Sequence, residues 1–409
     1  MESWAETSES SDPGLKRAPD GTPLYVHLPF CASKCHYCDF YSLPDAGQDI
    51  DGTLDAILAE ARTRAPWHPR TVFFGGGTPS LLSVKQWGRF ADELQRITGF
   101  RDSATEVTAE CNPESLDLDK ARALLDAGIP RLSIGFQSLS DARLELFGRV
   151  HDTEASFKAH EAARMAGVQA VNIDMIFAAP GQTPEEWTSE LARVLELRPD
   201  SFSAYNLTFE EGTTFHRWRD QGKLENHPEE AELEMFHEAR SASEKRGYSP
   251  YEVSNYALSG RECQHNVNYW ENGAYLGIGP SAVSKVGQTR SGNTRSLGAY
   301  RKQLTTTGSA NDWQETLTPP HRLGETWWLG LRMTAGLSPE RAATTAGCND
   351  PGARQRAIDL AEKFVAQGLL EKHAEHFTLS AKGIPLADAI AAEFLTQVPL
   401  ESDLPSPPN

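Results

Sequence analysis

Three cysteines, Cys31, Cys35 and Cys38, fall within a stretch of eight residues. Their spacing lets three thiolates reach one metal centre but supplies no obvious fourth ligand. A structural zinc ion takes four ligands, whereas an iron–sulfur cube held by three cysteines keeps one iron open. Zinc, with His36 or His27 as the fourth ligand, is the alternative that the spacing leaves open. We therefore expect a metal centre here, with a 4Fe–4S cluster favoured over zinc.

The composition limits the kind of protein that carries this centre. The chain has 409 residues, which is enough for two domains, and a formal net charge of −18. No run of Lys and Arg forms the basic surface that nucleic-acid binding requires, so no nucleic-acid partner is expected. Residues 1–20 lack the apolar core of a secretory signal, and no apolar run is long enough to cross a bilayer. Clustered thiols with few other cysteines fit a reducing compartment, and we expect a cytoplasmic protein.

Short β-rich runs alternate with amphipathic stretches over the first half of the chain. The pattern predicts strands at 24–27, 71–74, 106–110, 131–134, 170–176 and 201–206. It predicts helices at 52–64, 83–97, 118–127, 153–166 and 184–197. Six βα units favour a parallel sheet covered by helices, and six are too few for a closed eight-fold barrel. The expected fold class is therefore α/β, with an open (β/α)6 partial barrel.

The C-terminal part follows another pattern. Helices are expected at 321–332, with Trp327, Trp328 and Leu331 on the apolar face, and at 352–367. A small hairpin is expected from 368–371 and 377–380. This order predicts a smaller α+β domain that resembles a winged-helix module. Since the chain is acidic, we expect this domain to act as a lid or substrate cover and not to bind DNA.

Several polar residues follow the predicted strands, where the loops of βα barrels build active sites. The glycines 75–77 are either a tight strand-to-helix turn or a place where backbone approaches a ligand. Glu110 at a strand end is by itself an ordinary solvated acid. Asp174 lies within an apolar strand, so its carboxylate must be partnered or face a cavity. Cys111, Cys263 and Cys348 are scattered and are expected to be small buried residues.

Together these motifs resemble the radical S-adenosylmethionine superfamily, and within it the coproporphyrinogen-oxidase-like branch. The resemblance rests on Tyr25-x-His-x-Pro-Phe-Cys31-x3-Cys35-x2-Cys38 and on Gly75-Gly-Gly-Thr-Pro79. Glu110-Cys-Asn-Pro113, Ser133-Ile-Gly-Phe-Gln-Ser138, Gly148-Arg-Val-His151 and Asn172-Ile-Asp-Met175 follow in the order of that branch. The resemblance implies a 4Fe–4S cluster held by the three cysteines, with S-adenosylmethionine bound at its open iron.

Two functions occur in this branch, and the cluster motif does not distinguish them. One is oxygen-independent coproporphyrinogen III oxidase, a radical enzyme that decarboxylates coproporphyrinogen in heme biosynthesis. The other is the HemW-type heme chaperone, which binds heme and delivers it to apo-hemoproteins. The resemblance favours the chaperone, because Asp39-Phe40 follows Cys38 where the oxidase has Gly-Cys, and because His265-Asn-Val-Asn-Tyr-Trp270 matches the heme-binding motif of the HemW type. A turn with packed aromatics is the alternative for this motif.

One position departs from the HemW pattern. The chain has Gly279-Pro-Ser-Ala-Val283-Ser284 where HemW-type sequences commonly have Gly-x-Gly-Ala-His-Ser. Val283 therefore removes a second histidine that could contact heme, and His265 remains as the candidate axial ligand. Tyr269 and Trp270 would offer aromatic faces to the macrocycle.

By position, the resemblance implies one set of cofactor-binding residues: Tyr25, Phe40, Gly76, Gly77, Thr78, Glu110, Gln137, Arg149 and Asp174, with His265 for heme. It also implies heme and respiratory apo-hemoproteins as partners, with peripheral contact at the inner face of the membrane. The expected domains are a disordered segment 1–20, the radical S-adenosylmethionine barrel 21–250, a heme-motif segment 251–310, the C-terminal domain 311–400 and a disordered tail 401–409.

Overall fold

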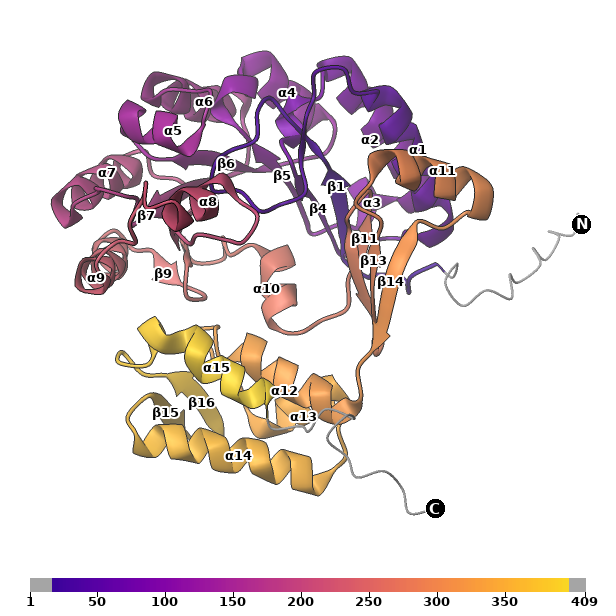
Figure 1. Ribbon diagram of the computed structural model, residues 1–409. Coiled ribbons are helices and arrows are strands. Elements are labelled where there is room, and N and C mark those ends of the chain that lie inside the picture. The colour runs from indigo at the N-terminus through magenta and orange to yellow at the C-terminus, as the bar shows by residue number, and fades with distance from the viewer. Residues whose placement is uncertain (1–16, 397–409) are drawn as a thin grey trace, which may run out of the picture.

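A nine-stranded sheet forms the centre of the larger part of the protein. The computed structural model describes residues 17–396 (Figure 1). Six neighbouring parallel strands lie in chain order: β1 (Leu24–Leu28), β4 (Thr71–Gly76), β5 (Glu106–Cys111), β6 (Arg131–Gln137), β7 (Ala170–Phe177) and β8 (Ser201–Asn206). β11 (Leu276–Ile278) adds a parallel strand beside β1. β10 (Asn255–Ala257) and β9 (Ser249–Pro250) extend the β8 edge in antiparallel pairing. The sheet is open, since β11 and β9 are its two edges.

Helices cover one face of this curved sheet, as Figure 1 shows. They are α1 (Ile50–Arg64), α2 (Val84–Thr98), α4 (Leu118–Asp126), α6 (Thr153–Ala166) and α7 (Pro184–Glu196). Their starts are specified locally: Ser83 forms a capping box with Gln86 at α2, and Thr183 forms one with Glu186 at α7. The strands are mostly buried and apolar, as expected for parallel strands covered on a face by helices.

Shorter elements lie around the loops and the sheet edges. β2 (Phe30–Cys31) and β3 (Leu43–Pro44) pair in parallel and frame the cysteine segment. The other helices of this part are α3 (Phe100–Ser103), α5 (Asp141–Phe147), α8 (Thr214–Asp220), α9 (Glu229–Lys245) and α10 (Gln264–Trp270).

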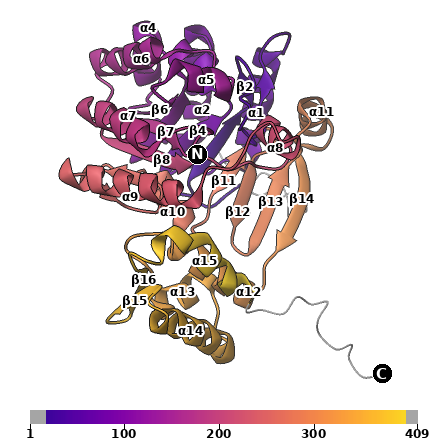
Figure 2. The ribbon, with the colours of Figure 1, turned by 60° about the vertical axis from the view of Figure 1, so that its left-hand side comes forward.

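A three-stranded antiparallel sheet stands beside β11 (Figure 2). It consists of β12 (Val283–Val286), β13 (Thr289–Asn293) and β14 (Asn311–Thr316), with α11 (Leu297–Thr307) between the last two strands. Backbone hydrogen bonds between Tyr275 and Lys285 tie β12 to the segment before β11. This small sheet was not predicted, although Val-Gly-Gln-Thr at 286–289 is a typical hairpin turn signal.

The C-terminal part has its own apolar core. It contains α12 (Pro319–Gly330), α13 (Pro339–Ala346), α14 (Pro351–Ala366), the hairpin β15 (Leu370–His373) with β16 (His376–Leu379), and α15 (Ala387–Leu395). Trp327 of α12 stacks on Phe394 of α15 with ring centroids 5.0 Å apart. Trp327 and Leu331 are buried as expected.

The α/β fold class, with an open six-unit parallel barrel and a smaller α+β domain, is confirmed. The C-terminal hairpin and both predicted helices are present, but α13 lies between those helices and was missed. The limits expected for the domains stay predictions, and most of the expected disordered segment 1–20 and all of 401–409 lie outside the described residues. No helix within residues 17–396 is long and apolar enough to cross a membrane.

Candidate cluster and cofactor site

Each of the three clustered cysteines receives a hydrogen bond from a different donor. Cys31 Sγ accepts from Thr78 Oγ1 at 3.4 Å, and Cys35 Sγ accepts from Arg149 Nη1 at 3.6 Å. Lys34 Nζ lies 4.0 Å from Cys38 Sγ. Two cations and a hydroxyl therefore face three sulfur atoms, an environment that stabilises thiolate ligands and tunes an iron–sulfur cluster.

Two thiols of this segment, those of Cys31 and Cys38, hold their protons in the absence of a metal. Burial raises the pKa of Cys31, and burial raises the pKa of Cys38 to about 11. Metal binding by these cysteines must therefore release protons, so it weakens as the pH falls.

The surroundings fit an iron–sulfur cube better than a zinc ion. Across residues 17–396, no three His, Cys, Asp or Glu side chains converge closely enough to hold a single ion. Both ring nitrogens of His27 are engaged, with the Tyr25 hydroxyl at 3.1 Å and the Tyr41 carbonyl at 2.9 Å. His36 Nδ1 bonds the Leu146 carbonyl at 2.9 Å, and its Nε2 packs closely on Gly148, where a Cβ would lie 3.0 Å from it. A cube is wider than one ion, so its three thiolates need not converge on a point.

A polar chain connects two of the cysteines through the loops after three strands. Thr78 Oγ1, the donor to Cys31, accepts from Asn112 Nδ2 at 2.9 Å. Asn112 Oδ1 accepts from Arg149 Nη2 at 2.7 Å, and Arg149 is also the donor to Cys35. The structure thus brings Thr78 and Arg149 together with the cluster cysteines. Asn112 was not among the predicted site residues. It directly follows β5 and precedes Pro113, and this position at the end of a barrel strand could have suggested it.

The glycine triplet is required by close packing of the chain on itself. Gly76 has a φ of 105°, and a Cβ there would lie 2.4 Å from the His27 ring. A Cβ on Gly77 would lie 2.5 Å from the Phe30 carbonyl oxygen. The tight-turn interpretation of the triplet therefore accounts for both glycines, and contact with a ligand would be a second role.

Two carboxylates lie on the strands β5 and β7, which flank β6 in the sheet. Glu110 accepts from the Gly76 amide at 3.1 Å, and burial together with the charge of Asp174 raises its pKa to about 7. Asp174 is held by Ser133, Asn172 and Ser203, each at 2.8 Å. Burial raises the pKa of Asp174 in spite of these donors. The expectation that Asp174 must be partnered is met, and Glu110 is the carboxylate with free hydrogen-bonding capacity.

Gln137 ends β6 in a strained backbone conformation. Its φ is 64°, which residues other than glycine rarely adopt, and the pairing of β6 with β7 is irregular between Gly135 and Gln137. The Gly135 carbonyl accepts from Arg149 at 3.0 Å, so Gln137 lies beside the arginine that serves Cys35. Such strain concentrates at functional sites.

Two further predicted residues, Tyr25 and Phe40, come from the segments before and after the three cysteines. Tyr25 in β1 stacks on Phe73, with ring centroids 6.2 Å apart. The Phe40 carbonyl accepts from Lys34, the lysine beside Cys38, while the Phe40 side chain is 66% exposed. Phe40 therefore presents an apolar side chain next to the cluster loop.

His265 is placed differently from the other predicted residues. It lies at the start of α10, is 1% exposed, and stacks on Phe73 at 5.4 Å. Its Nδ1 pairs with Thr71 Oγ1 at 2.8 Å and its Nε2 with the Tyr269 hydroxyl at 3.0 Å. Burial and then Arg70 lower the pKa of His265 to about 3, so the ring is neutral. In this conformation neither nitrogen offers a lone pair to iron.

Comparison with known proteins identifies the family. Residues 25–193 match the model of the radical SAM superfamily. The heme chaperone HemW of Bacillus subtilis is 34% identical over 380 residues, which cover 91% of this chain and 99% of the relative. The chain belongs to the HemW family. HemW of Mycobacterium tuberculosis strain H37Rv is 32% identical over 393 residues, 94% of this chain and 97% of the relative.

A solved structure extends the similarity of this HemW family member to the oxidase. Coproporphyrinogen III oxidase (HemN) from Escherichia coli, a radical SAM enzyme, aligns with a TM-score of 0.79 and 25% identity. The alignment covers 94% of this chain and 91% of the oxidase chain. Both the barrel and the C-terminal part are therefore shared with HemN.

Membership of the radical SAM superfamily implies a 4Fe–4S cluster and S-adenosylmethionine. When bound, the cluster supplies an electron and an open iron position. Within this HemW family member, the three sulfur atoms with their separate donors fit that group, and Cys31, Cys35 and Cys38 are the residues that would hold it.

Proposed function

We propose that this protein is a heme chaperone that binds a 4Fe–4S cluster, S-adenosylmethionine and heme, and delivers heme to apo-hemoproteins. The observation that carries the proposal is the identity of 31–34% with several HemW heme chaperones, including that of Bacillus subtilis over 91% of this chain. Respiratory apo-hemoproteins at the inner face of the membrane are the recipients we propose.

The cofactor residues belong to the same proposal. We assign the cluster to Cys31, Cys35 and Cys38, and S-adenosylmethionine to the residues around them: Tyr25, Phe40, Gly76, Gly77, Thr78, Glu110, Gln137, Arg149 and Asp174. Glu110 can accept from the amino group or a ribose hydroxyl of the nucleotide, because within residues 17–396 its carboxylate accepts a hydrogen bond from the Gly76 amide alone.

His265 is our candidate axial ligand to heme iron, although its nitrogens are engaged. Of its two partners, Tyr269 lines a cavity, so movement of Tyr269 would expose Nε2 toward that cavity. Tyr269→Phe removes the partner of Nε2 and should tighten hemin binding, while His265→Ala should change the hemin spectrum and weaken binding. If His265→Ala binds hemin with the wild-type spectrum, His265 is not the ligand.

The alternative function is that of coproporphyrinogen III oxidase, which the structural similarity to HemN favours. Anaerobic reconstitution with iron and sulfide, followed by hemin titration and an oxidase assay, separates the two. We expect hemin binding, transfer of hemin to an apo-hemoprotein, and no conversion of coproporphyrinogen under reducing conditions. Robust protoporphyrinogen formation would overturn the proposal.

A matched pair of cysteine variants tests the cluster itself. Cys31→Ser should lose iron and sulfide on reconstitution. Cys348→Ala, which changes a cysteine that is 1% exposed in the C-terminal core, should keep both. Retention of zinc alone by the wild-type protein would contradict the cluster.

A further inference from the structure

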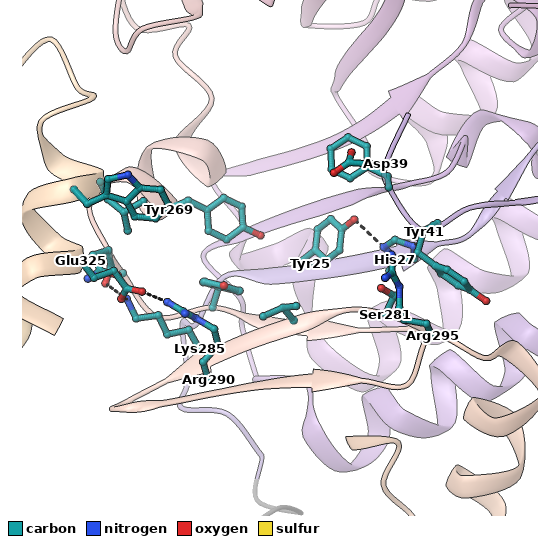
Figure 3. Close-up of a pocket in the computed structure, with 17 residues that line it drawn as sticks. Tyr25, His27, Asp39, Tyr41, Tyr269, Ser281, Lys285, Arg290, Arg295 and Glu325 are labelled. Carbon is teal, nitrogen blue, oxygen red and sulfur yellow. Dashed lines mark hydrogen bonds and ion pairs between the residues drawn. The ribbon is translucent and has the colours of Figure 1, made fainter. Parts of the chain in front are cut away.

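A cavity of about 580 Å³ lies where three distant parts of the chain meet. Its walls come from β1 with the loop directly after Cys38, from the segment that leads from α10 into the small sheet, and from α12 (Figure 3). Its size is within the range of about 300–1,000 Å³ that is usual for ligand sites. Asp39 and Phe40 line it, so the cavity adjoins the cluster loop.

Aromatic rings supply much of the wall. Tyr25, Tyr41, Tyr269, Tyr275 and Trp328 all line the cavity. Tyr269 and Tyr275 meet edge to face, with centroids 4.6 Å apart and an interplanar angle of 88°. Trp328 was expected on the apolar face of its helix with Trp327, but only Trp327 enters the core while Trp328 faces this cavity. Such walls suit a flat, conjugated ligand.

Two of the three basic residues that line the cavity are neutralised within the protein. Lys285 Nζ lies 3.3 Å from Glu325 Oε2, and Arg290 pairs with both Glu325 and Glu315. Two cations thus face two carboxylates, and Lys285, Arg290 and Glu325 form one end of the cavity in Figure 3.

Arg295 lies at the other end of the cavity, and no carboxylate of the described residues neutralises its charge. Over residues 17–396, no ion pair or hydrogen bond of its guanidinium is recorded, and its nearest ring contact is Tyr41 at 5.9 Å. His27 beside it is neutral, since burial lowers the pKa of His27 to about 4. Asp39 also lines the cavity, on the loop after Cys38, but pairs with no cation in the described part of the chain. Arg295 is therefore available to a carboxylate that enters from outside.

We propose that this cavity is the porphyrin site and that Arg295 binds a propionate of the heme. The macrocycle would lie against Tyr269, Tyr275 and Trp328, and Tyr25 and Phe40, which we assign to S-adenosylmethionine, would form the boundary between the two ligands. The guanidinium would pair with a carboxylate in the two-bond geometry that arginine favours. Tyr269, the hydrogen-bond partner of His265, forms part of the wall and separates that imidazole from the cavity. This inference rests on the proposed function, because it assigns a place to the heme that the function requires.

Hemin and its dimethyl ester provide the test. The ester keeps the ring and the iron but lacks the carboxylates that Arg295 would bind. We expect Arg295→Ala to weaken hemin binding by about tenfold or more, because the variant loses one charge-assisted hydrogen-bonded pair. The wild-type protein should bind the ester as weakly as the variant binds hemin, and the variant should not distinguish the two ligands. Arg122→Ala, an exposed arginine on α4, is the matched control and should bind as the wild type does.

Failure of this inference is distinguishable from failure of the proposed function. If the wild type binds no hemin, the chaperone function is wrong. If hemin binds but neither the ester nor Arg295→Ala changes its affinity, the chaperone stands and the assignment of Arg295 is wrong. If Arg295→Ala weakens binding of S-adenosylmethionine and leaves hemin unaffected, the carboxylate at Arg295 is that of the methionine moiety, which also overturns the inference.

Discussion

Glu110 is a carboxylate whose surroundings keep it partly protonated near neutral pH. Burial, and then the charge of Asp174, raise its pKa to about 7, and the Gly76 amide offsets only part of this. Among the acids around the cluster, Asp174 has three side-chain donors, whereas Glu110 has one backbone donor. Glu110 is therefore the acid whose carboxylate can still accept a hydrogen bond from a ligand.

This raised pKa predicts how binding of S-adenosylmethionine depends on pH. The ionised carboxylate of Glu110 would accept a hydrogen bond from S-adenosylmethionine more strongly than the protonated form. Affinity should therefore rise as the pH increases through about 7, by at most about tenfold per pH unit. Glu110→Gln should bind S-adenosylmethionine at every pH with the low affinity of the protonated form. Isothermal titration calorimetry across the pH range measures this. Glu340→Gln, an exposed acid on α13, should keep the wild-type profile.

Equal profiles for the wild type and Glu110→Gln would contradict a contact between Glu110 and the ligand. The sequence suggested Glu110 by its place at a strand end and by the resemblance that Glu110-Cys-Asn-Pro113 carries. Its pKa depends on Asp174, which is 64 residues further along the chain and two strands away in the sheet, so no local pattern could reveal it.

At the scale of elements, local chemistry predicted the barrel well. Strands such as β7 are apolar along their length, and helices such as α7 begin with Thr-Pro and a capping Glu186, so both kinds of signal were strong. α13 was missed although Ser338-Pro339 and Gly347 mark its ends. β10 and β11 have only three residues each, too few for a periodic pattern, and are specified by pairing with β8 and β1.

Two glycines in neighbouring elements should respond in opposite ways to the same substitution. Gly77→Ala places a Cβ 2.5 Å from the Phe30 carbonyl, so the free energy of unfolding should fall by about 1–3 kcal/mol. Gly88 lies within α2, is exposed, and has nothing within 4 Å of a new Cβ. Gly88→Ala should therefore raise the free energy of unfolding by about 0.5–1 kcal/mol.

Chemical denaturation followed by circular dichroism measures both changes. A neutral Gly77→Ala would mean that β2 and the loop after β4 can separate without loss of stability. In that case Gly77 would be kept for a ligand and not for packing.

At the scale of the whole molecule, the cavity is the feature that sequence reasoning did not reach. Arg295, Tyr269 and Trp328 belong to three segments. The sequence connected Tyr269 with heme through the motif that contains His265, whereas Arg295 and Trp328 have ordinary local explanations as a surface charge and a packed aromatic. They meet only because β11 joins the sheet next to β1 and the small sheet follows it. The cluster cysteines, in contrast, lie in one short segment, which is why the sequence placed them directly.

The C-terminal domain is joined to the barrel by polar contacts beside the cavity. Met333 pairs with Glu252, and the Thr334 amide donates to the Tyr251 carbonyl at 3.1 Å. Asn272 Nδ2 donates to Thr326 Oγ1 at 2.9 Å, and the Asn272 carbonyl accepts from Lys285 at 3.1 Å. Asn272 therefore connects α12 with the basic end of the cavity.

Removal of the Thr326 hydroxyl should loosen this junction. Thr326 is 1% exposed, and Thr326→Val keeps its shape but leaves the buried amide of Asn272 without an acceptor. We expect the free energy of unfolding to fall by about 1–3 kcal/mol. Thr344→Val changes an exposed threonine of α13 and should stay within about 0.5 kcal/mol of the wild type. Equal stability of the two variants in urea would mean that the hydrogen bond between Asn272 and Thr326 does not stabilise the junction.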